Sequence, residues 1–247
     1  MKHLIIIVSI LFSLNSSVFS QADVKAMVDL ANDLIKLNRY DEAMEKFNEA
    51  LDYLPSYAPG INGKANLLIL QGEYKDAYKL VDDGIQKNSD FAPYYLTRGI
   101  ILINNKRYDK AIEDLNRALD LTQGKNDKIL ENKIYVNRGA AYQKLTEYDA
   151  ALSDYSKAIS LSTKNPNVYM YRGFLYYQTQ DYNEALKDFN LVIEIDPENP
   201  IAYYNRGMIY LKLDNETDAC RDFHKSCELG NTNACKMVVS RCVNLTN

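Results

Sequence analysis

The sequence predicts an all-helical (all-α) protein built from six repeated helix pairs, and three observations support this fold class. First, an Arg-Gly dipeptide recurs along the chain at a nearly constant spacing. Second, a tyrosine and an alanine recur with the same period. Third, the 247 residues are 47% hydrophobic and 25% charged, which is the composition of an ordinary folded protein rather than of a disordered or membrane-spanning one.

The repeat is clearest at four Arg-Gly dipeptides, each with a tyrosine three residues before the arginine. The last three arginines lie 34 residues apart, and the first two lie 40 apart. Upstream, Ala31 and Ala65 stand where the pattern places glycine. This spacing indicates repetition of one structural unit. The dipeptides and their tyrosines are Arg98-Gly99 with Tyr95, Arg138-Gly139 with Tyr135, Arg172-Gly173 with Tyr169, and Arg206-Gly207 with Tyr203.

A tyrosine followed three residues later by an alanine marks the second half of each of the first five units. Small residues let two helix backbones approach, and a large aromatic residue nearby fills the wider gap beside the crossing. Such helix pairs are apolar on more than one face, so each must stack on its neighbours. The sixth unit has Glu216 in place of tyrosine but keeps Ala219 and Phe223. The tyrosine and alanine pairs are Tyr40 with Ala43, Tyr74 with Ala77, Tyr108 with Ala111, Tyr148 with Ala151, and Tyr182 with Ala185.

These residues resemble the tetratricopeptide repeat (TPR) family, whose unit is a pair of antiparallel helices. The resemblance implies a right-handed superhelical solenoid of about six helix-turn-helix units, followed by a C-terminal capping helix. It covers nearly all of residues 21–247, which we expect to form the repeat domain. The expected units are residues 24–57, 58–91, 92–125, 132–165, 166–199 and 200–233, with the cap helix over 232–243.

Residues at the unit boundaries supply the expected helix starts. Asn165-Pro166 and Asn199-Pro200 each place a capping residue before a proline in the first helical turn. Residues 126–131 are additional to the repeat. We expect Asn126 or Asp127 to cap a first helix that is longer in the fourth unit than elsewhere.

Arginine and aspartate also recur together. In four units the arginine before the glycine has an aspartate sixteen residues later, whereas the first two units have neither residue at these positions. The two positions lie on facing helices, so we predict an ion pair within the unit or to the adjoining one. Four identical pairs at one period are typical of a scaffold rather than of a binding site. The pairs are Arg98 with Asp114, Arg138 with Asp154, Arg172 with Asp188, and Arg206 with Asp222.

Residues 1–20 have the features of a secretory signal peptide. A short basic start precedes an apolar run over residues 4–14, which is too short to cross a bilayer as a mature helix. The segment Val18-Phe19-Ser20 offers small residues for signal peptidase, so we expect cleavage near Ser20 and a periplasmic or secreted protein beginning at Gln21. The alternative is an uncleaved membrane anchor, which the short run and the serine and asparagine after it disfavour.

The charge of the chain limits its partners. The formal net charge is −4, and removal of Lys2 with the signal lowers it by one to −5. No helix is expected to carry a basic stripe, so nucleic acid is not an expected partner. No later stretch has the apolar length of a spanning helix. We therefore expect a soluble protein outside the cytoplasm that associates with a membrane only through a partner. The sequence does not specify its oligomeric state.

The four cysteines lie near the C-terminus, and an even number is typical of a disulfide framework in an exported protein. Cys220 and Cys227 are seven residues apart, as are Cys235 and Cys242, so each pair lies on one face of its helix. Gly230 and the asparagine after it form a helix stop and turn. An antiparallel hairpin centred there brings Cys227 to Cys235 and Cys220 to Cys242. A bridge within one helix would have to span too great a distance.

This segment also resembles the cysteine-rich relatives of the TPR family, in which a bridge joins the two helices of a unit. Two alternatives are a four-cysteine zinc site and a redox-active pair. Zinc sites prefer a closer paired spacing, and the sequence has no Cys-x-x-Cys motif.

The sequence offers little for catalysis, and we expect no enzyme, no cofactor and no metal site. His224 is the only histidine expected in the mature chain, so no triad or histidine-based metal cluster can form. The chain has no glycine-rich phosphate loop. Carboxylates are concentrated at helix starts, where capping and solvation explain them. An acid pair that converges in space is the catalytic possibility that the sequence leaves open.

The TPR resemblance implies that the first helices of successive units line a concave groove that takes a peptide or helix. The early positions of this groove are rich in asparagine, whose amide can pair with a peptide backbone. The later ones are aromatic and apolar, which is typical of binding anchors, although the aromatic side chains could also pack on a neighbouring unit. Some family members hold a chaperone carboxylate with two lysines, and this sequence does not match that clamp. The candidate peptide-binding residues are Asn62, Asn66, Thr97, Asn137, Tyr171, Phe174, Tyr177, Tyr204, Asn205 and Met208.

The sequence therefore predicts an exported scaffold that docks a protein or peptide segment in its groove, in the assembly of an envelope or secretion complex. The alternative is an exported cysteine-rich protein that handles redox equivalents or metal.

Overall fold

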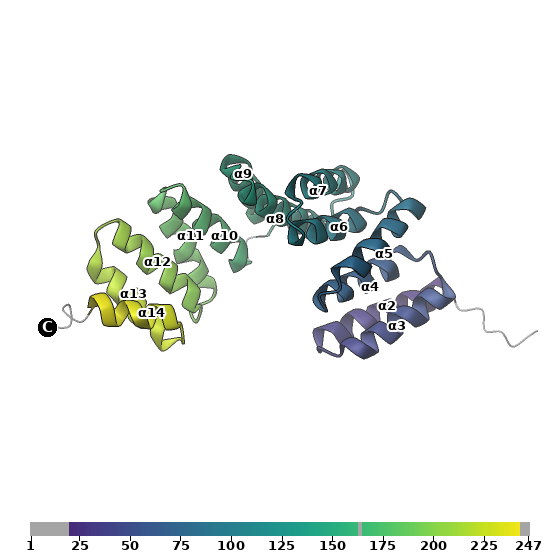
Figure 1. Cartoon of the computed structure of the whole chain (residues 1–247), viewed down its shortest axis with the longest axis horizontal. Helices are drawn as coiled ribbons and strands as arrows, with labels where there is room; N and C mark the ends of the chain where they lie inside the picture. Colours follow the sequence, from purple (N-terminus) through teal and green to yellow (C-terminus); the bar gives the residue numbers. More distant parts are fainter. Residues whose placement is uncertain (1–19, 163–164, 243–247) are drawn as a thin grey trace, which may run out of the picture. The chain divides into compact units, whose positions relative to one another are not determined.

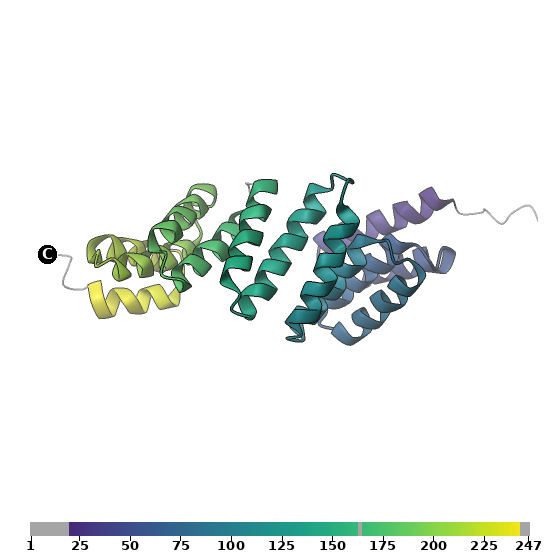
Figure 2. The ribbon, with the colours of Figure 1, turned by 90° about the horizontal axis from the view of Figure 1, so that it is seen from above.

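The computed structural model describes residues 20–162 and 165–242, and every regular element within them is a helix. These residues form thirteen α-helices and a final π-helical segment (Figures 1 and 2). The chain divides into two compact units, with the division between Ile101 and Leu102. The predicted signal peptide lies outside the described residues except for Ser20, and residues 243–247 are also outside them.

The first compact unit is built from antiparallel helices that pack on their neighbours in sequence. Helix α2 packs on α3 and α4, α3 packs on α4, and α4 packs on α5. A buried cluster that includes Val28, Ala31 and Phe47 fills the space between α2 and α3. The helices of this unit are α2 (Gln21–Lys36), α3 (Tyr40–Tyr53), α4 (Ala58–Leu70), α5 (Tyr74–Lys87) and most of α6 (Ala92–Asn104).

The second compact unit continues the same packing. Each helix from α7 to α13 packs on the next, and α14 and the π-helix η1 pack on α13. This arrangement confirms the prediction of an all-helical repeat fold. The elements are α7 (Tyr108–Thr122), α8 (Lys128–Lys144), α9 (Tyr148–Leu161), α10 (Pro166–Gln178), α11 (Tyr182–Ile195), α12 (Pro200–Lys212), α13 (Glu216–Glu228), α14 (Thr232–Met237) and η1 (Val238–Cys242).

Side-chain caps fix several helix starts where the sequence predicts them. Asn165 accepts a hydrogen bond from the backbone of Asn167 at the start of α10, and Asn199 accepts one from Ala202 in α12. Asp127 caps α8 by accepting from the backbone N–H of Leu130 at 3.0 Å. Helix α8 has 17 residues, compared with 13 in α10 and in α12, so the additional residues lengthen the first helix of the fourth unit as predicted.

The glycine of the repeat lies against an aromatic ring of the facing helix in the second compact unit. A Cβ atom added at Gly207 would lie 2.8 Å from the ring of Phe223, which is closer than van der Waals contact permits. The same addition at Gly139 would lie 2.9 Å from the ring of Tyr155. All three aromatic side chains at this position, Tyr155, Phe189 and Phe223, are at most 1% exposed. The absence of a side chain on the glycine therefore lets the ring fill the helix crossing.

Each repeat arginine of the second compact unit is held by the aspartate sixteen residues later. Arg172 donates through Nε and Nη2 to the two carboxylate oxygens of Asp188, at 2.9 and 2.8 Å. Arg138 with Asp154 and Arg206 with Asp222 have the same two-bond geometry at 2.7 to 2.8 Å. These contacts confirm the predicted ion pair in the fourth, fifth and sixth repeats. Two parallel hydrogen bonds also fix the orientation of the guanidinium plane.

The third guanidinium nitrogen reaches back to the preceding helix pair. Nη1 of Arg172 donates to the Ser156 hydroxyl at 3.0 Å. Nη1 of Arg206 donates to the Asn190 side chain at 2.7 Å. The arginine therefore joins the second helix of its own pair to the second helix of the pair before. The corresponding contacts elsewhere are Arg138 to Asn116, Arg98 to Asp82 and Lys64 to Asn48, at 2.6 to 2.7 Å.

Two tyrosines of the same helix flank each of these arginines. The guanidinium carbon of Arg172 lies 6.0 Å from the ring centre of Tyr169 and 5.8 Å from that of Tyr176. Aromatic rings at this distance attract a cation and stack on the planar guanidinium group. The flanking tyrosines are Tyr135 and Tyr142 for Arg138, Tyr169 and Tyr176 for Arg172, and Tyr203 and Tyr210 for Arg206.

Burial and pairing act in opposite directions on Asp188. Burial raises the pKa of its carboxyl above the ordinary value, and the hydrogen bonds from Arg172 only partly offset that increase. The same hydrogen bonds raise the pKa of the Arg172 guanidinium. The Asp188 side chain is 2% exposed. Its carboxylate therefore has little access to water as a substitute for the arginine.

Replacing Arg172 with Ala should destabilise the protein by about 3 kcal/mol, because it leaves the Asp188 carboxylate buried without its partner. The double variant Arg172→Ala with Asp188→Ala should lose less than the sum of the two single losses, with a coupling of about 1 to 3 kcal/mol. Urea denaturation of the four proteins measures this coupling. The exposed pair Lys187 and Glu184 is the matched control and should show little coupling. Additive losses at Arg172 and Asp188 would contradict the contact.

The destabilisation by Arg172→Ala should shrink as the pH is lowered from about 8 to about 5. Without Arg172, the buried Asp188 carboxyl has a pKa higher in the folded than in the unfolded protein, so the folded protein gains relative stability when it takes up a proton. Urea denaturation at several pH values measures the effect. The variant Arg172→Ala with Asp188→Asn has no carboxyl to titrate at this position and should lack the recovery. Identical pH profiles for the two variants would rule out this mechanism.

Candidate functional site

A pocket of about 160 Å³ lies between α10 and α12 in the second compact unit. Phe174 and Tyr177 of α10 form one wall; since they are three residues apart, they lie on the same face of the helix. The other wall is formed by α12. The full lining is Phe174, Tyr177, Phe189, Tyr204, Asn205 and Met208.

Contacts between aromatic rings support the side chains that line the pocket. Phe189 of α11 is 1% exposed and lies against Gly173 of α10, so it forms a fixed surface of the pocket. The ring of Tyr204 lies 5.9 Å from that of Phe223, centre to centre. The ring of Tyr177 lies 5.9 Å from that of Tyr182. These contacts indicate a pocket that exists before any ligand arrives.

Two lining residues give the pocket its chemical character. Phe174 is 44% exposed, whereas Phe47, Phe189 and Phe223 are at most 1% exposed. Asn205 is partly buried, and its side-chain amide forms no hydrogen bond with the described part of the chain. An amide offers both a donor and an acceptor to an incoming group. The site therefore combines an apolar surface with one free polar group.

The structure brings together five of the ten candidate peptide-binding residues. Phe174, Tyr177, Tyr204, Asn205 and Met208 all line the pocket. Their role in binding a peptide stays a prediction. The aromatic position four residues after the repeat alanine supplies the sixth lining residue, Phe189, which the sequence pattern assigns to the scaffold.

Candidate residues outside the pocket have partners within the protein. In the first compact unit the Thr97 hydroxyl lies 2.8 Å from the Asn62 side-chain oxygen and 3.2 Å from that of Asn66, and Thr97 is 2% exposed. Asn137 of α8 donates to the backbone carbonyl of Lys133 at 2.7 Å.

Tyr171 also lies outside the pocket. It is 44% exposed, as Phe174 is, but its ring lies beside Tyr155, with the ring centres 6.0 Å apart. It therefore provides a natural comparison for Phe174 on the same helix.

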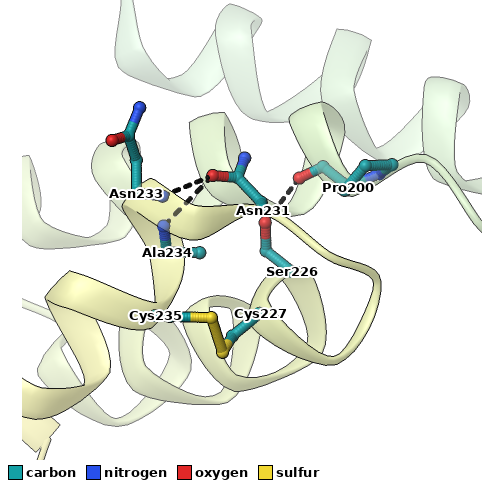
Figure 3. Close-up of a disulfide and its surroundings, with 7 residues drawn as sticks. All are labelled: Pro200, Ser226, Cys227, Asn231, Asn233, Ala234 and Cys235. Carbon is teal, nitrogen blue, oxygen red and sulfur yellow. Dashed lines mark hydrogen bonds between the residues drawn. A yellow bond between two sulfur atoms is a disulfide. The ribbon is translucent and has the colours of Figure 1, made fainter.

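The four cysteines form two disulfides at the C-terminal end of the described chain. Cys220 is joined to Cys242, with the Cα atoms 5.6 Å apart, and Cys227 is joined to Cys235, with the Cα atoms 4.7 Å apart. The sequence predicts these same two pairs. Figure 3 shows the Cys227–Cys235 bridge beside the turn, where Asn231 accepts hydrogen bonds from the backbones of Asn233 and Ala234.

The four cysteines are all joined in disulfides. A cysteine in a disulfide has no thiolate to offer zinc. Among residues 20–162 and 165–242, no three His, Cys, Asp or Glu side chains converge as metal ligands would. Within the same ranges, no helix combines the length and the apolar character that crossing a membrane requires.

Comparison with known families shows that the chain belongs to the tetratricopeptide repeat family. Sequence patterns described as TPR repeat match residues 139–180 and 175–214. Patterns described as tetratricopeptide repeat match residues 34–101, 92–124 and 201–233. Proteins of this family are in general scaffolds without catalytic activity, and they commonly bind protein or peptide partners. The family therefore supports a protein-interaction role for this chain.

Curated relatives share only part of their length with this chain. It is 34% identical over 106 residues to a DnaJ homolog subfamily C member 3 homolog of Dictyostelium discoideum, a match that covers 41% of this chain and 20% of the relative. It is 25% identical over 124 residues to the human protein O-mannosyl-transferase TMTC1, covering 50% of this chain and 14% of the relative. The chain thus spans about a fifth or less of these two proteins.

Solved structures share the fold at low sequence identity. The Pseudomonas aeruginosa pilF structure aligns with a TM-score of 0.75 and 17% identity, over 88% of this chain and 96% of that one. YrrB, described as a TPR protein with an unusual peptide-binding site, aligns with a TM-score of 0.61 and 23% identity, over 78% of this chain and 97% of that one. These similarities concern the fold.

Proposed function

We propose that this protein is an exported adaptor without catalytic activity, which binds a protein segment by taking one apolar side chain into the pocket between α10 and α12. The observation that carries the proposal is a preformed aromatic pocket with an exposed ring, Phe174, and a free amide, Asn205. Exposed aromatic rings in a pocket are typical anchors of protein interfaces.

The size of the pocket limits the anchor to one side chain. Its volume is about 160 Å³. In another protein, a cavity of about 150 Å³ is large enough to bind benzene. A phenylalanine ring or a leucine side chain of the partner therefore fits this pocket. The rings of Tyr177 and Tyr204 keep the pocket mainly apolar, and their hydroxyl groups can accommodate a polar atom on the partner's side chain.

Asn205 supplies the contact that would orient the partner backbone. Its amide can donate to a peptide carbonyl and accept from a peptide N–H at the same time. It lies on α12 one residue after Tyr204, so backbone and anchor would be held by the same wall of the pocket. This geometry favours an extended segment, because a helical partner has no free backbone groups in its middle turns.

The proposed location is outside the cytoplasm, periplasmic or secreted. The apolar run near the start of the chain and the cleavage site near Ser20 support export. Two disulfides support the same conclusion, because such bridges persist in oxidising compartments. An exported adaptor of this kind would serve the assembly of an envelope or secretion complex.

The pocket can be tested with a blocked Ala-Ala-Phe-Ala-Ala peptide and protein whose methionine methyl groups carry carbon-13. Titration should shift the Met208 methyl resonance, because this side chain lines the pocket. Phe174→Ala should weaken the binding by about tenfold, as loss of an anchor contact usually does. Tyr171→Ala is the matched control and should bind within about twofold of the wild type. Equal losses in the two variants, or no shift in the wild type, would refute the pocket assignment.

Export can be tested by producing the full chain in cells with a secretion pathway and measuring the intact mass of the exported protein. Cleavage near Ser20 predicts a protein that begins at Gln21. A charged residue placed in the apolar run, such as Ile6→Arg, should keep the protein inside the cell. Retention of the wild-type chain in the cytoplasm would contradict the proposed location.

A further inference from the structure

The C-terminal segment after α13 is covalently joined to the last helix pair. Helix α14 and η1 pack on α13, and α13 packs on α12, the helix that carries one wall of the pocket. The bridge Cys220–Cys242 closes this segment onto α13 at one end, and Cys227–Cys235 closes it beside the turn. We call the segment Thr232–Cys242 the C-terminal clasp.

One buried cluster connects the clasp with the pocket wall. Its buried members are Ala219, Cys220, Phe223, Ala234 and Cys242. Tyr204 and Met208, which both line the pocket, pack against this cluster from α12. Met237 and Val238 pack against the same cluster from the clasp. The clasp and the pocket wall therefore both contact one set of buried side chains.

Phe223 is the central contact of this connection. Its side chain is completely buried, and its ring lies beside that of Tyr204. On α12 it fits against Gly207, where an added Cβ would lie only 2.8 Å from the ring. A displacement of Phe223 would therefore be felt directly by the helix that carries Tyr204, Asn205 and Met208.

The two bridges differ in their relation to the buried cluster. Cys220 and Cys242 are 6% and 1% exposed, and both belong to it. Cys227 and Cys235 are only partly buried; Cys227 packs against the cluster without being one of its buried members, and the bridge lies beside the turn where Asn231 caps α14 (Figure 3). There, Ser226 donates a further hydrogen bond to the carbonyl of Pro200 at 2.6 Å. The turn is thus held by side-chain hydrogen bonds as well as by its bridge.

We propose that the Cys220–Cys242 disulfide braces the α12 wall of the pocket through Phe223, so that the pocket keeps its binding shape only while this bridge is closed. The proposal rests on the proposed function of the pocket and adds that the redox state of this disulfide controls peptide binding. A dithiol reductant would open the bridge by giving two electrons and two protons, which leaves two cysteine thiols and one disulfide on the reductant. Reoxidation would restore the brace.

The experiment compares two double variants that each remove one bridge. Cys220→Ala with Cys242→Ala should accelerate hydrogen exchange in the α12 amides from Tyr204 to Tyr210 by about tenfold, because the wall opens more often. The same variant should weaken binding of the blocked Ala-Ala-Phe-Ala-Ala peptide by a similar factor. Cys227→Ala with Cys235→Ala is the matched control and should change both quantities by less than about twofold. Equal effects of the two variants on α12 would overturn the proposal.

A third variant, Phe223→Leu, keeps both bridges and removes the ring contact with Tyr204. It should reproduce the faster exchange in α12 and the weaker peptide binding. Unchanged exchange and binding in this variant would overturn the proposal that Phe223 connects the disulfide to α12. This holds even if loss of Cys220–Cys242 unfolded the C-terminal helices as a whole. If the wild type fails to bind the peptide, the proposed function fails. Hydrogen exchange in α12 then still tests the brace independently.

Discussion

In the helix pairs of the second compact unit, an aromatic ring of one helix lies directly on a glycine of the facing helix. The pocket depends on this contact twice. Phe189, seated against Gly173, forms a fixed surface of the pocket, and Phe223, seated against Gly207, supports Tyr204 in its wall. A methyl group at either glycine would push the ring outward, because the interior has no spare volume. The same contact that packs the scaffold therefore also shapes the candidate binding site.

The arginines set how successive helix pairs stack. Each guanidinium group in the fifth and sixth repeats binds the aspartate of its own pair and a polar side chain of the pair before, as Arg172 does with Asp188 and Ser156. Apolar packing alone tolerates small sliding of one helix along another, whereas a planar group with three directed hydrogen bonds does not. Two flanking tyrosine rings also attract the guanidinium charge of Arg172. These arginine hydrogen bonds thus fix the relative positions of helices that apolar packing alone would hold less specifically.

The sequence predicts the fold well, because a fixed period relates residues that share one place in the unit. Arg172 and Asp188 could be paired for that reason, and Cys220 and Cys242 because they lie at equal distances from Asn231 in the turn. The pocket was less accessible to prediction. Its lining depends on the rotation of α12 relative to α10, which the period does not specify. Hence Tyr171 and Phe174 look alike in sequence, although only Phe174 lines the pocket.

One wall of the pocket lies next to the disulfide-bonded segment that packs on α13. A helix pair inside the array is supported on both sides by its neighbours, and within the described residues the elements that pack on α13 after the sixth pair are the short α14 and η1. Short elements of this kind tend to open locally unless something holds them. Two disulfides join this short segment to α13, next to the aromatic cluster that carries the pocket wall. The pair α12 and α13 can therefore hold Tyr204, Asn205 and Met208 in one wall of the pocket, across from the exposed ring of Phe174 on α10, while two covalent bridges support α13.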